Sequence, residues 1–295
     1  MLFRVLLAAG LASAAAAQTP APTELPALNV VGRPVPGENK IVGSYGQPEW
    51  SARRPFPGVS VYVQPEHQAE LEFGYADALS PTGAHQREWT QEIELGLGHR
   101  FQAALENDYA DFRDDSSHRH DWHEVGLRAA LRYALADWGQ CPLNPALGLG
   151  WRANSGAADA ALYELALGDE LAPRWHWGAN ATYERQNGSA RHREFLAAGA
   201  LTYSVTNETL NVGVQAEWRR AYEAGDAPSL ARRSGLGPCL QYRPSDRLHL
   251  DLVGLWGTEH GHAVHGVRLS VGFEFGEGSD DHDDDERRPG GRFGR

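Results

Sequence analysis

Long apolar runs are missing from this sequence, and their absence excludes a helical membrane protein. No stretch approaches the roughly 20 apolar residues that a membrane-spanning helix needs. Lysine is also scarce, since Lys40 is the single one, and the 39 acidic residues outnumber the 27 lysines and arginines, which gives a net charge of −12. A nucleic-acid partner needs a basic face on the protein, so we expect no nucleic acid among the partners.

Cysteine is equally scarce. The two cysteines, Cys141 and Cys239, show no spacing typical of a metal site, and we predict neither a metal centre nor a cofactor. In an oxidising compartment the two thiols could form a disulfide, and the sequence leaves that question open.

The chain does have an export signal at its start. Arg4 supplies the positive charge, Val5–Leu11 the short apolar run, and Ala15–Ala17 a small-residue cleavage site. We therefore predict that residues 1–17 are a signal peptide.

From Gln68 onward, apolar and polar residues alternate in segments of about ten residues, most clearly in Val267–Phe275. Successive side chains point to opposite faces of a strand, so each segment has one apolar and one polar face. Recurrence of this pattern predicts an all-β fold, a transmembrane antiparallel up-and-down β-barrel of about 12 strands within residues 67–276. The predicted strands are 68–76, 89–98, 100–110, 122–135, 144–152, 160–168, 174–185, 194–206, 209–219, 234–243, 247–256 and 266–275.

The predicted connections alternate between long and short, as expected when outer loops are long and periplasmic turns are short. The link 136–143 is longer than the other predicted turns, and the link 257–265 is counted among the outer loops. Aromatic residues at both ends of the strands predict two belts at the membrane surfaces. They are Tyr75, Trp89, Tyr109, Trp122, Trp151, Tyr183, Trp218 and Trp256 at the loop ends, and Phe101, Tyr133, Trp175, Tyr203, Tyr242 and Phe275 at the turn ends.

Charged residues fall almost entirely on the face predicted to line the lumen, because an arginine at the lipid midplane costs about 2–4 kcal/mol. Opposite charges on neighbouring strands there can either fill the lumen or line a narrow pore that selects by charge. The predicted lumen-lining residues are Glu70, Glu72, Glu92, Glu94, Glu106, Asp108, Arg128, Arg132, Arg152, Glu217, Asp251 and Arg268.

Residues 18–66 are rich in proline and lack a sustained apolar period, which predicts an extended periplasmic leader. Its later part, from Gln47 to Val63, has an apolar end that we expect to pack under or inside the barrel mouth. Thr23–Gly32 resembles the energy-coupling box at the start of TonB-dependent receptors. The resemblance implies an energy-coupling partner protein through residues 23–32, and a short β-prone linker is the alternative interpretation.

Residues 277–295 form an acidic tail that we predict to be disordered. Phe275 ends the last strand and resembles the terminal aromatic signal that barrel-insertion machinery recognises, although the chain continues beyond it. The expected partners are therefore outer-membrane lipid and that machinery.

An outer-membrane lipid-modifying enzyme is an alternative interpretation, since twelve-stranded barrels include outer-membrane phospholipase A. Asn154-Ser155-Gly156 resembles part of the cluster of that family, but no histidine precedes it at the needed spacing, and we predict no catalytic residues. Histidines of the predicted outer loops could bind a metal ion, but we interpret them as solvated polar loops. They are His118, His120, His123, His260, His262 and His265.

The signal, the strand spacing and the last strand together resemble Gram-negative outer-membrane β-barrel proteins, and more loosely the phenol-degradation-pathway transporter barrels. This resemblance implies location in the cell outer membrane. We expect a narrow channel or uptake pore for small solutes, and not an enzyme. A plugged structural or surface-interaction barrel without transport is the other alternative.

Overall fold

The computed structural model describes residues 40–59, 61–79, 83, 85–113, 122–188, 192–206, 209–222 and 231–276. All described residues belong to the compact unit Pro34–Arg295. The predicted signal peptide, the segment 23–32, the acidic tail and the two histidines His118 and His120 lie outside the described residues.

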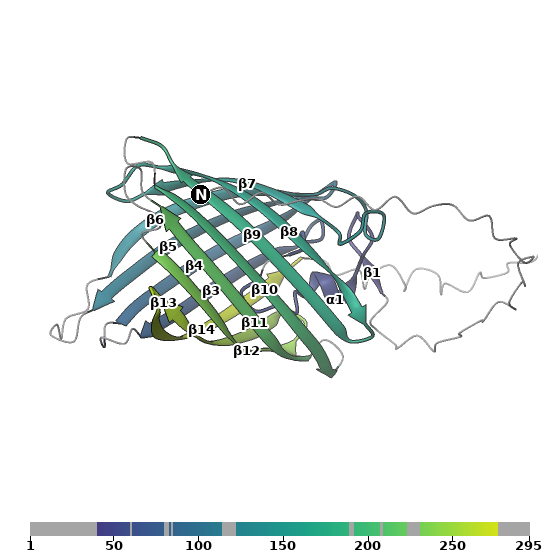
Figure 1. The fold of residues 1–295 in the computed structure, drawn as a ribbon. Helices are drawn as coiled ribbons and strands as arrows, with labels where there is room; N and C mark the ends of the chain where they lie inside the picture. Colours follow the sequence, from purple (N-terminus) through teal and green to yellow (C-terminus); the bar gives the residue numbers. More distant parts are fainter. Residues whose placement is uncertain are drawn as a thin grey trace, which may run out of the picture. The chain divides into compact units, whose positions relative to one another are not determined.

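Twelve antiparallel strands form a closed barrel in which β14 pairs with β3 and β9 pairs with β10 (Figure 1). Closure leaves no strand edge unpaired, which is the condition for spanning a bilayer with strands. The strands are β3 (Ala69–Leu79), β4 (His85–Gly98), β5 (Phe101–Arg113), β6 (His123–Ala134), β7 (Ala146–Asn154), β8 (Ala160–Ala172), β9 (Trp175–Gln186), β10 (Arg193–Thr206), β11 (Leu210–Tyr222), β12 (Ala231–Ser245), β13 (Leu248–Glu259) and β14 (His262–Phe275).

The prediction of a closed twelve-stranded barrel is confirmed, and each predicted strand overlaps one observed strand. Most strands extend further than predicted where their ends are charged. Arg220 lies in β11 beyond the predicted end at 219, and Arg232 lies in β12 before the predicted start at 234; the two are register partners. Both faces of these strand ends are polar, so the alternation that revealed the rest of each strand is absent there.

The prediction of an outer loop at residues 257–265 is wrong. Strands β13 and β14 continue to a two-residue turn, in which His260 has φ 50° and Gly261 has φ 85°. Two consecutive residues with positive φ are typical of the tight turns that join antiparallel strands. His262 and His265 therefore lie on β14 and not in a loop.

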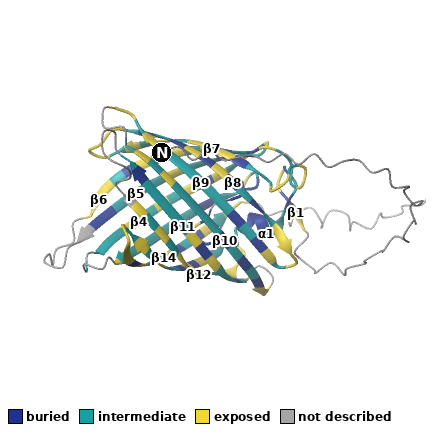
Figure 2. Cartoon of the chain, in the orientation of Figure 1, coloured by how far each residue is buried: buried dark blue, intermediate teal, exposed yellow. Residues whose placement is uncertain are grey.

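The outer surface of the barrel is apolar along its middle, and Figure 2 shows exposed and less exposed residues alternating along the strands. Ile93, Leu95 and Leu131, which lie on the apolar faces of their strands, are all exposed. Aromatic residues meet in rows across neighbouring strands, as the two belts require. The pairs include Tyr75 with Trp89, Trp89 with Tyr109, Phe101 with Tyr133, and Trp175 with Tyr203.

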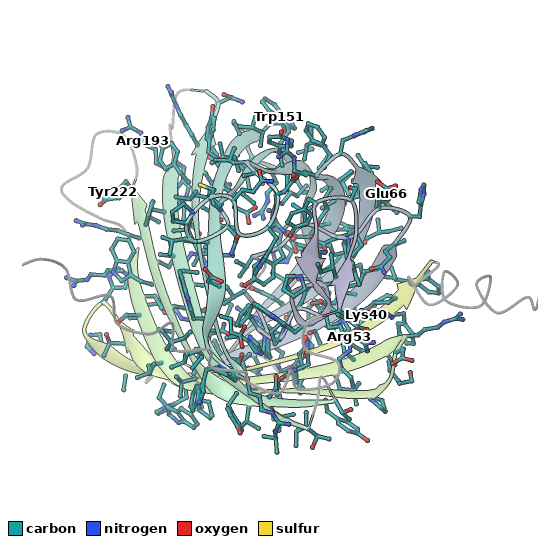
Figure 3. All side chains as sticks on the ribbon, turned by 90° about the vertical axis from the view of Figure 1, so that its right-hand side faces the viewer. Lys40, Arg53, Glu66, Trp151, Arg193 and Tyr222 are labelled. Atoms are coloured by element: carbon teal, nitrogen blue, oxygen red, sulfur yellow. The ribbon has the colours of Figure 1, made fainter. Side chains whose placement is uncertain are left out.

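The segment that precedes the barrel lies inside it. We call the described residues of the segment 40–66 the N-terminal plug; they comprise β1 (Ile41–Val42), β2 (Gln47–Pro48), the single turn α1 (Glu49–Ala52), and an extended part. Figures 1 and 3 show it within the ring of strands at one end of the barrel. None of the helices in the described part of the chain is long and apolar enough to cross a membrane.

The plug enters at the end of the barrel that carries the short turns, such as His99-Arg100 and Pro173-Arg174. We call this the turn end. The turn 135–145, longer than the others at this end, contacts the plug, since the Trp138 amide donates a 2.8 Å hydrogen bond to the Tyr45 carbonyl. Cys141 of this turn and Cys239 of β12 are both free thiols.

Candidate solute path through the barrel

The predicted lumen-lining residues gather in three groups, all on inward positions of the strands. The first group lies on β5 to β9 and alternates in charge. Arg128 lies 3.2 Å from Glu106 and 3.6 Å from Glu164, while Arg132 lies 2.7 Å from Glu164. Each guanidinium therefore faces a carboxylate on a neighbouring strand, or two strands away, in a partly buried setting.

Arg152 extends this first group towards the other end of the barrel. Its guanidinium lies 3.5 Å from both Glu106 and Asp108 and 3.6 Å from Glu184. Removing one partner of a buried ion pair costs about 3–5 kcal/mol, because the other charge stays desolvated. Loss of one charged residue of this first group should therefore destabilise the carboxylates or guanidiniums that it pairs with.

The second group is on the opposite wall. Arg268 of β14 reaches across the inside of the barrel to Glu217 of β11, with the two charged atoms 2.8 Å apart. The tip of the plug lies against this pair. Gly58 has φ 71°, and a Cβ at this position would lie 2.6 Å from Nη1 of Arg268. The plug thus reaches the level of the middle of β14.

The third group is a block of carboxylates on β3 and β4. Glu70 is the register partner of Glu94, and Glu72 is the register partner of Glu92, so like charges face each other twice. Such pairs are destabilising unless a cation lies beside them. The structure supplies one from the plug, the guanidinium of Arg54, which forms ion pairs with Glu70 (3.2 Å) and with Glu94.

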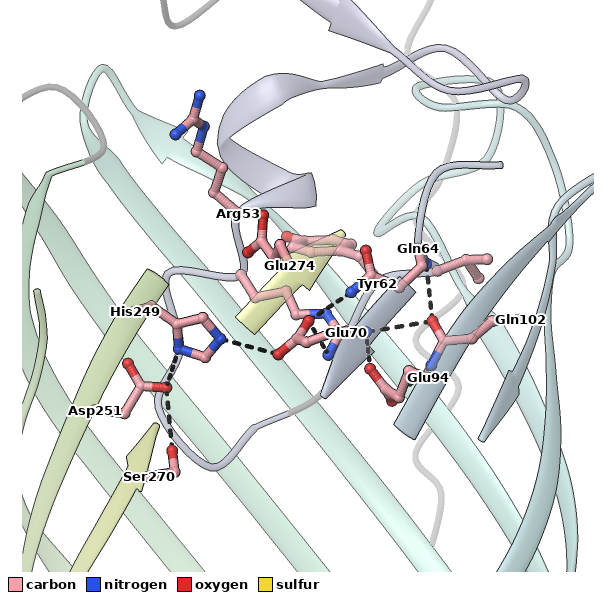
Figure 4. Close-up of polar contacts among 12 residues, drawn as sticks. Arg53, Tyr62, Gln64, Glu70, Glu94, Gln102, His249, Asp251, Ser270 and Glu274 are labelled. Atoms are coloured by element: carbon pink, nitrogen blue, oxygen red, sulfur yellow. Dashed lines mark hydrogen bonds and ion pairs between the residues drawn. The ribbon is translucent and has the colours of Figure 1, made fainter. Parts of the chain in front are cut away.

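Two residues of the barrel wall hold this third group in place (Figure 4). His249 of β13 lies between Glu70 and Asp251, with its ring nitrogens 2.9 Å and 3.2 Å from the two carboxylates. Gln102 of β5 donates a 2.6 Å hydrogen bond to Glu94. Asp251, a predicted lumen residue, therefore lies on the side of the carboxylate block remote from Glu94.

Small residues of the barrel wall make room for the apolar side of the plug. Gly168 and Gly178 are register partners on β8 and β9, and a Cβ on Gly178 would lie 2.5 Å from a Val61 methyl and 3.1 Å from the Phe56 ring. A larger residue at either glycine would displace the plug. The buried apolar cluster contains Tyr45, Trp50, Phe56, Val59, Val61, Tyr62 and Val63 of the plug with Ala134, Ala146, Ala166 and Ala200 of the wall.

Trp50 is the centre of this cluster. Its ring stacks on His176 with centroids 4.0 Å apart, and makes edge contacts with Tyr62 and Trp138, each at 5.6 Å. Aromatic pairs in such arrangements contribute about 0.5–1.5 kcal/mol each beyond the burial of their area. Both ring nitrogens of His176 are buried without a hydrogen-bond partner, so its contribution there is packing.

The barrel also binds the backbone of the plug. The side chain of Gln241 donates to the Arg54 carbonyl (2.8 Å), that of Arg243 to the Arg53 carbonyl (3.2 Å), and that of Arg132 to the Tyr62 carbonyl (3.3 Å). These donors satisfy carbonyls that would otherwise be buried unpaired in an extended segment. The plug is therefore bound by polar as well as apolar contacts.

Arg54 adopts a left-handed backbone conformation, with φ 48°. This conformation costs an L-residue about 1–2 kcal/mol, which its side-chain contacts offset. Burial lowers the pKa of Arg54, but the carboxylates of Glu70, Glu94 and Glu92 outweigh that effect, and the net pKa lies above its ordinary value. The guanidinium therefore remains charged inside the barrel.

Arg54, His176 and the cluster around Trp50 were not among the predicted site residues. The apolar end of the leader was the one signal in the sequence, and the structure places that end inside the barrel mouth. Ser155 lies in the exposed turn after β7.

A closed barrel with an apolar outer surface, aromatic rows at both ends and charged residues inside defines a transmembrane β-barrel. The chain is accordingly an outer-membrane β-barrel protein. Residues 160–275 match the family described as the putative MetA-pathway of phenol degradation. No curated protein sequence matches the chain.

Solved structures share the fold at low sequence identity. The COG4313 outer-membrane channel from Pseudomonas putida F1 is 13% identical, with a TM-score of 0.51 over 75% of this chain and 99% of that one. The NanC porin is 14% identical, with a TM-score of 0.47 over 70% of this chain and 98% of that one. The first of these supports the fold alone.

Proposed function

We propose that the protein is a narrow outer-membrane pore for small solutes, with a charged lumen and a plug that closes its turn end. The observation that carries this proposal is the division of the lumen into two parts. Paired charges line the walls of β5 to β9, whereas the plug fills the turn end with its apolar cluster and Arg54. Passage of a solute then requires movement of the plug.

A protein described as an outer-membrane channel shares this fold, and we propose transport without enzymatic activity for this chain as well. Lumen charges act as rings of charged side chains do in channels, by favouring ions of one sign at close range. Twelve strands leave a narrow bore, so the solutes are small.

The test is conductance of the purified protein in planar bilayers. We expect brief openings with a measurable ion preference. Arg128→Gln removes a positive charge beside Glu106 and Glu164, so it should shift the reversal potential of these openings towards cations. Arg185→Gln is the matched control, because Arg185 is an exposed residue near the end of β9. An ion preference unchanged by Arg128→Gln would contradict a charge-selective lumen.

A plugged barrel without transport is the second candidate, and the dense packing around Trp50 favours it. It predicts no conductance under any condition that leaves the plug docked. It also predicts that variants with a loosened plug give no conductance, or lose their barrel fold altogether. The heat-dependent gel mobility of a folded barrel separates these last two outcomes.

A further inference from the structure

The plug places a guanidinium in a pocket of carboxylates that the barrel wall itself constructs. Glu70 and Glu94 are 2% and 3% exposed and face each other across β3 and β4. In each carboxylate, one oxygen is already bound by the wall. His249 is 2.9 Å from Oε1 of Glu70, and Gln102 donates to Oε1 of Glu94.

The remaining oxygens, Oε2 of both residues, face the same point. Arg54 occupies that point, with Nη1 3.2 Å from Glu70 Oε2 and Nη2 in contact with Glu94 Oε2. Gln64 of the plug also donates a 2.5 Å hydrogen bond to Oε2 of Glu70. The wall therefore orients two carboxylate oxygens towards one planar, forked cation, and the plug segment supplies that cation.

The wall next to this position is also acidic. Glu72 and Glu92 form the neighbouring register pair, and Glu92 is in turn the register partner of Glu106. Carboxylates thus continue from the position of Arg54 into the middle of the barrel. A cation that enters from the loop end meets this row before it meets the plug.

We propose that Glu70 and Glu94 form a binding site for a guanidinium-bearing solute, and that Arg54 occupies this site until the solute displaces it. The proposal names the solute class of the pore proposed above and rests on that function. Displacing Arg54 removes one of the contacts that bind the plug, so arrival of the solute favours opening. A planar guanidinium matches two separate oxygens better than an ammonium, which is a compact point charge.

Because Arg54 is tethered beside the site, it should compete with a free guanidinium ligand, and this competition can be measured as a change in ligand affinity. A side chain held by a short segment acts at a millimolar or higher effective concentration, so Arg54 should mask the site from free ligand. Arg54→Gln removes the competitor and keeps a polar side chain. We expect Arg54→Gln to bind methylguanidinium at least tenfold more tightly than the wild-type protein.

The experiment is calorimetric titration of the full mature protein in detergent with methylguanidinium chloride, with methylammonium and sodium chloride as comparators. Arg53→Gln is the matched control, because Arg53 forms ion pairs with Glu49 and with the exposed Asp246. We expect it to bind methylguanidinium with wild-type affinity. In the Arg54→Gln background, Glu94→Gln should abolish the binding, while the heat-dependent gel mobility confirms that each barrel is folded.

The proposal is overturned if folded Arg54→Gln binds methylguanidinium no better than wild type, if Glu94→Gln leaves that binding intact, or if methylammonium binds equally well. Binding is measured without conductance, so the two proposals fail separately. Binding with no conductance would refute the pore and leave the site, whereas conductance with no binding would refute the site and leave the pore.

Discussion

Removing the Trp50 side chain should release the plug without disturbing the barrel. Trp50 is 3% exposed and contacts Tyr62, Trp138 and His176. Truncation of a buried tryptophan to alanine costs about 3–5 kcal/mol. Because Trp50 belongs to the plug and not to a barrel strand, this cost falls on docking of the plug, and the strand pairing is unaffected.

Every 1.4 kcal/mol changes an equilibrium about tenfold, so Trp50→Ala should raise the ratio of undocked to docked plug by about a hundredfold or more. Single-channel recording should show a corresponding rise in the fraction of time open. Limited proteolysis of residues 40–66 should accelerate in parallel, while the heat-dependent gel mobility stays unchanged.

Trp151→Ala is the matched control, since Trp151 is an exposed tryptophan of β7 that pairs with Asp159 on the outside of the barrel. It should alter neither the open fraction nor the proteolysis of the plug. If folded Trp50→Ala had the open fraction and the protease resistance of wild type, the apolar cluster would not be what binds the plug.

Three further predictions concern the same segment. Gly178→Val places a Cβ 2.5 Å from a Val61 methyl, so it should raise the open fraction in bilayer recordings, and an unchanged fraction would show that this contact does not restrain the plug. Tyr62→Phe removes a buried hydroxyl without a hydrogen-bond partner, so docking should strengthen by about 1 kcal/mol and proteolysis of the plug should slow rather than quicken. Burial raises the pKa values of Tyr45 and Tyr62 above their ordinary value of 10.0, so the docked plug favours the neutral phenols. Their contribution is therefore fully present below about pH 10 and is lost as the pH rises further. The open fraction should rise above about pH 10 in wild type and stay level in the Tyr45→Phe/Tyr62→Phe double variant; a rise in both would assign the effect to other groups.

The barrel could be predicted from the sequence because lipid and water on its two sides enforce a period of two along every strand. The pattern in Val267–Phe275 recurs in all twelve strands for that reason. Strand ends were less predictable, since beyond the membrane both faces are polar. The tight turn at His260-Gly261 lies in such a region and was predicted as a loop.

The plug contacts were not predictable from local patterns. Arg54 meets Glu94, and Trp50 meets His176, across long stretches of chain that the closed barrel brings together. An extended segment carries no period to show which of its residues will be buried. Gly168 and Gly178 accommodate the plug, but the sequence alone does not show that a plug side chain will lie against them.

The location of the plug is tested most directly by thiol labelling at Val61. Val61 is 1% exposed against β8 and β9, whereas Ile41 at the start of the plug is 68% exposed. In a background without Cys141 and Cys239, Val61→Cys should resist a membrane-impermeant maleimide in the folded protein, while Ile41→Cys reacts readily. Equal labelling rates at the two positions, in a protein that retains heat-dependent gel mobility, would place residues 40–66 outside the barrel and contradict the account.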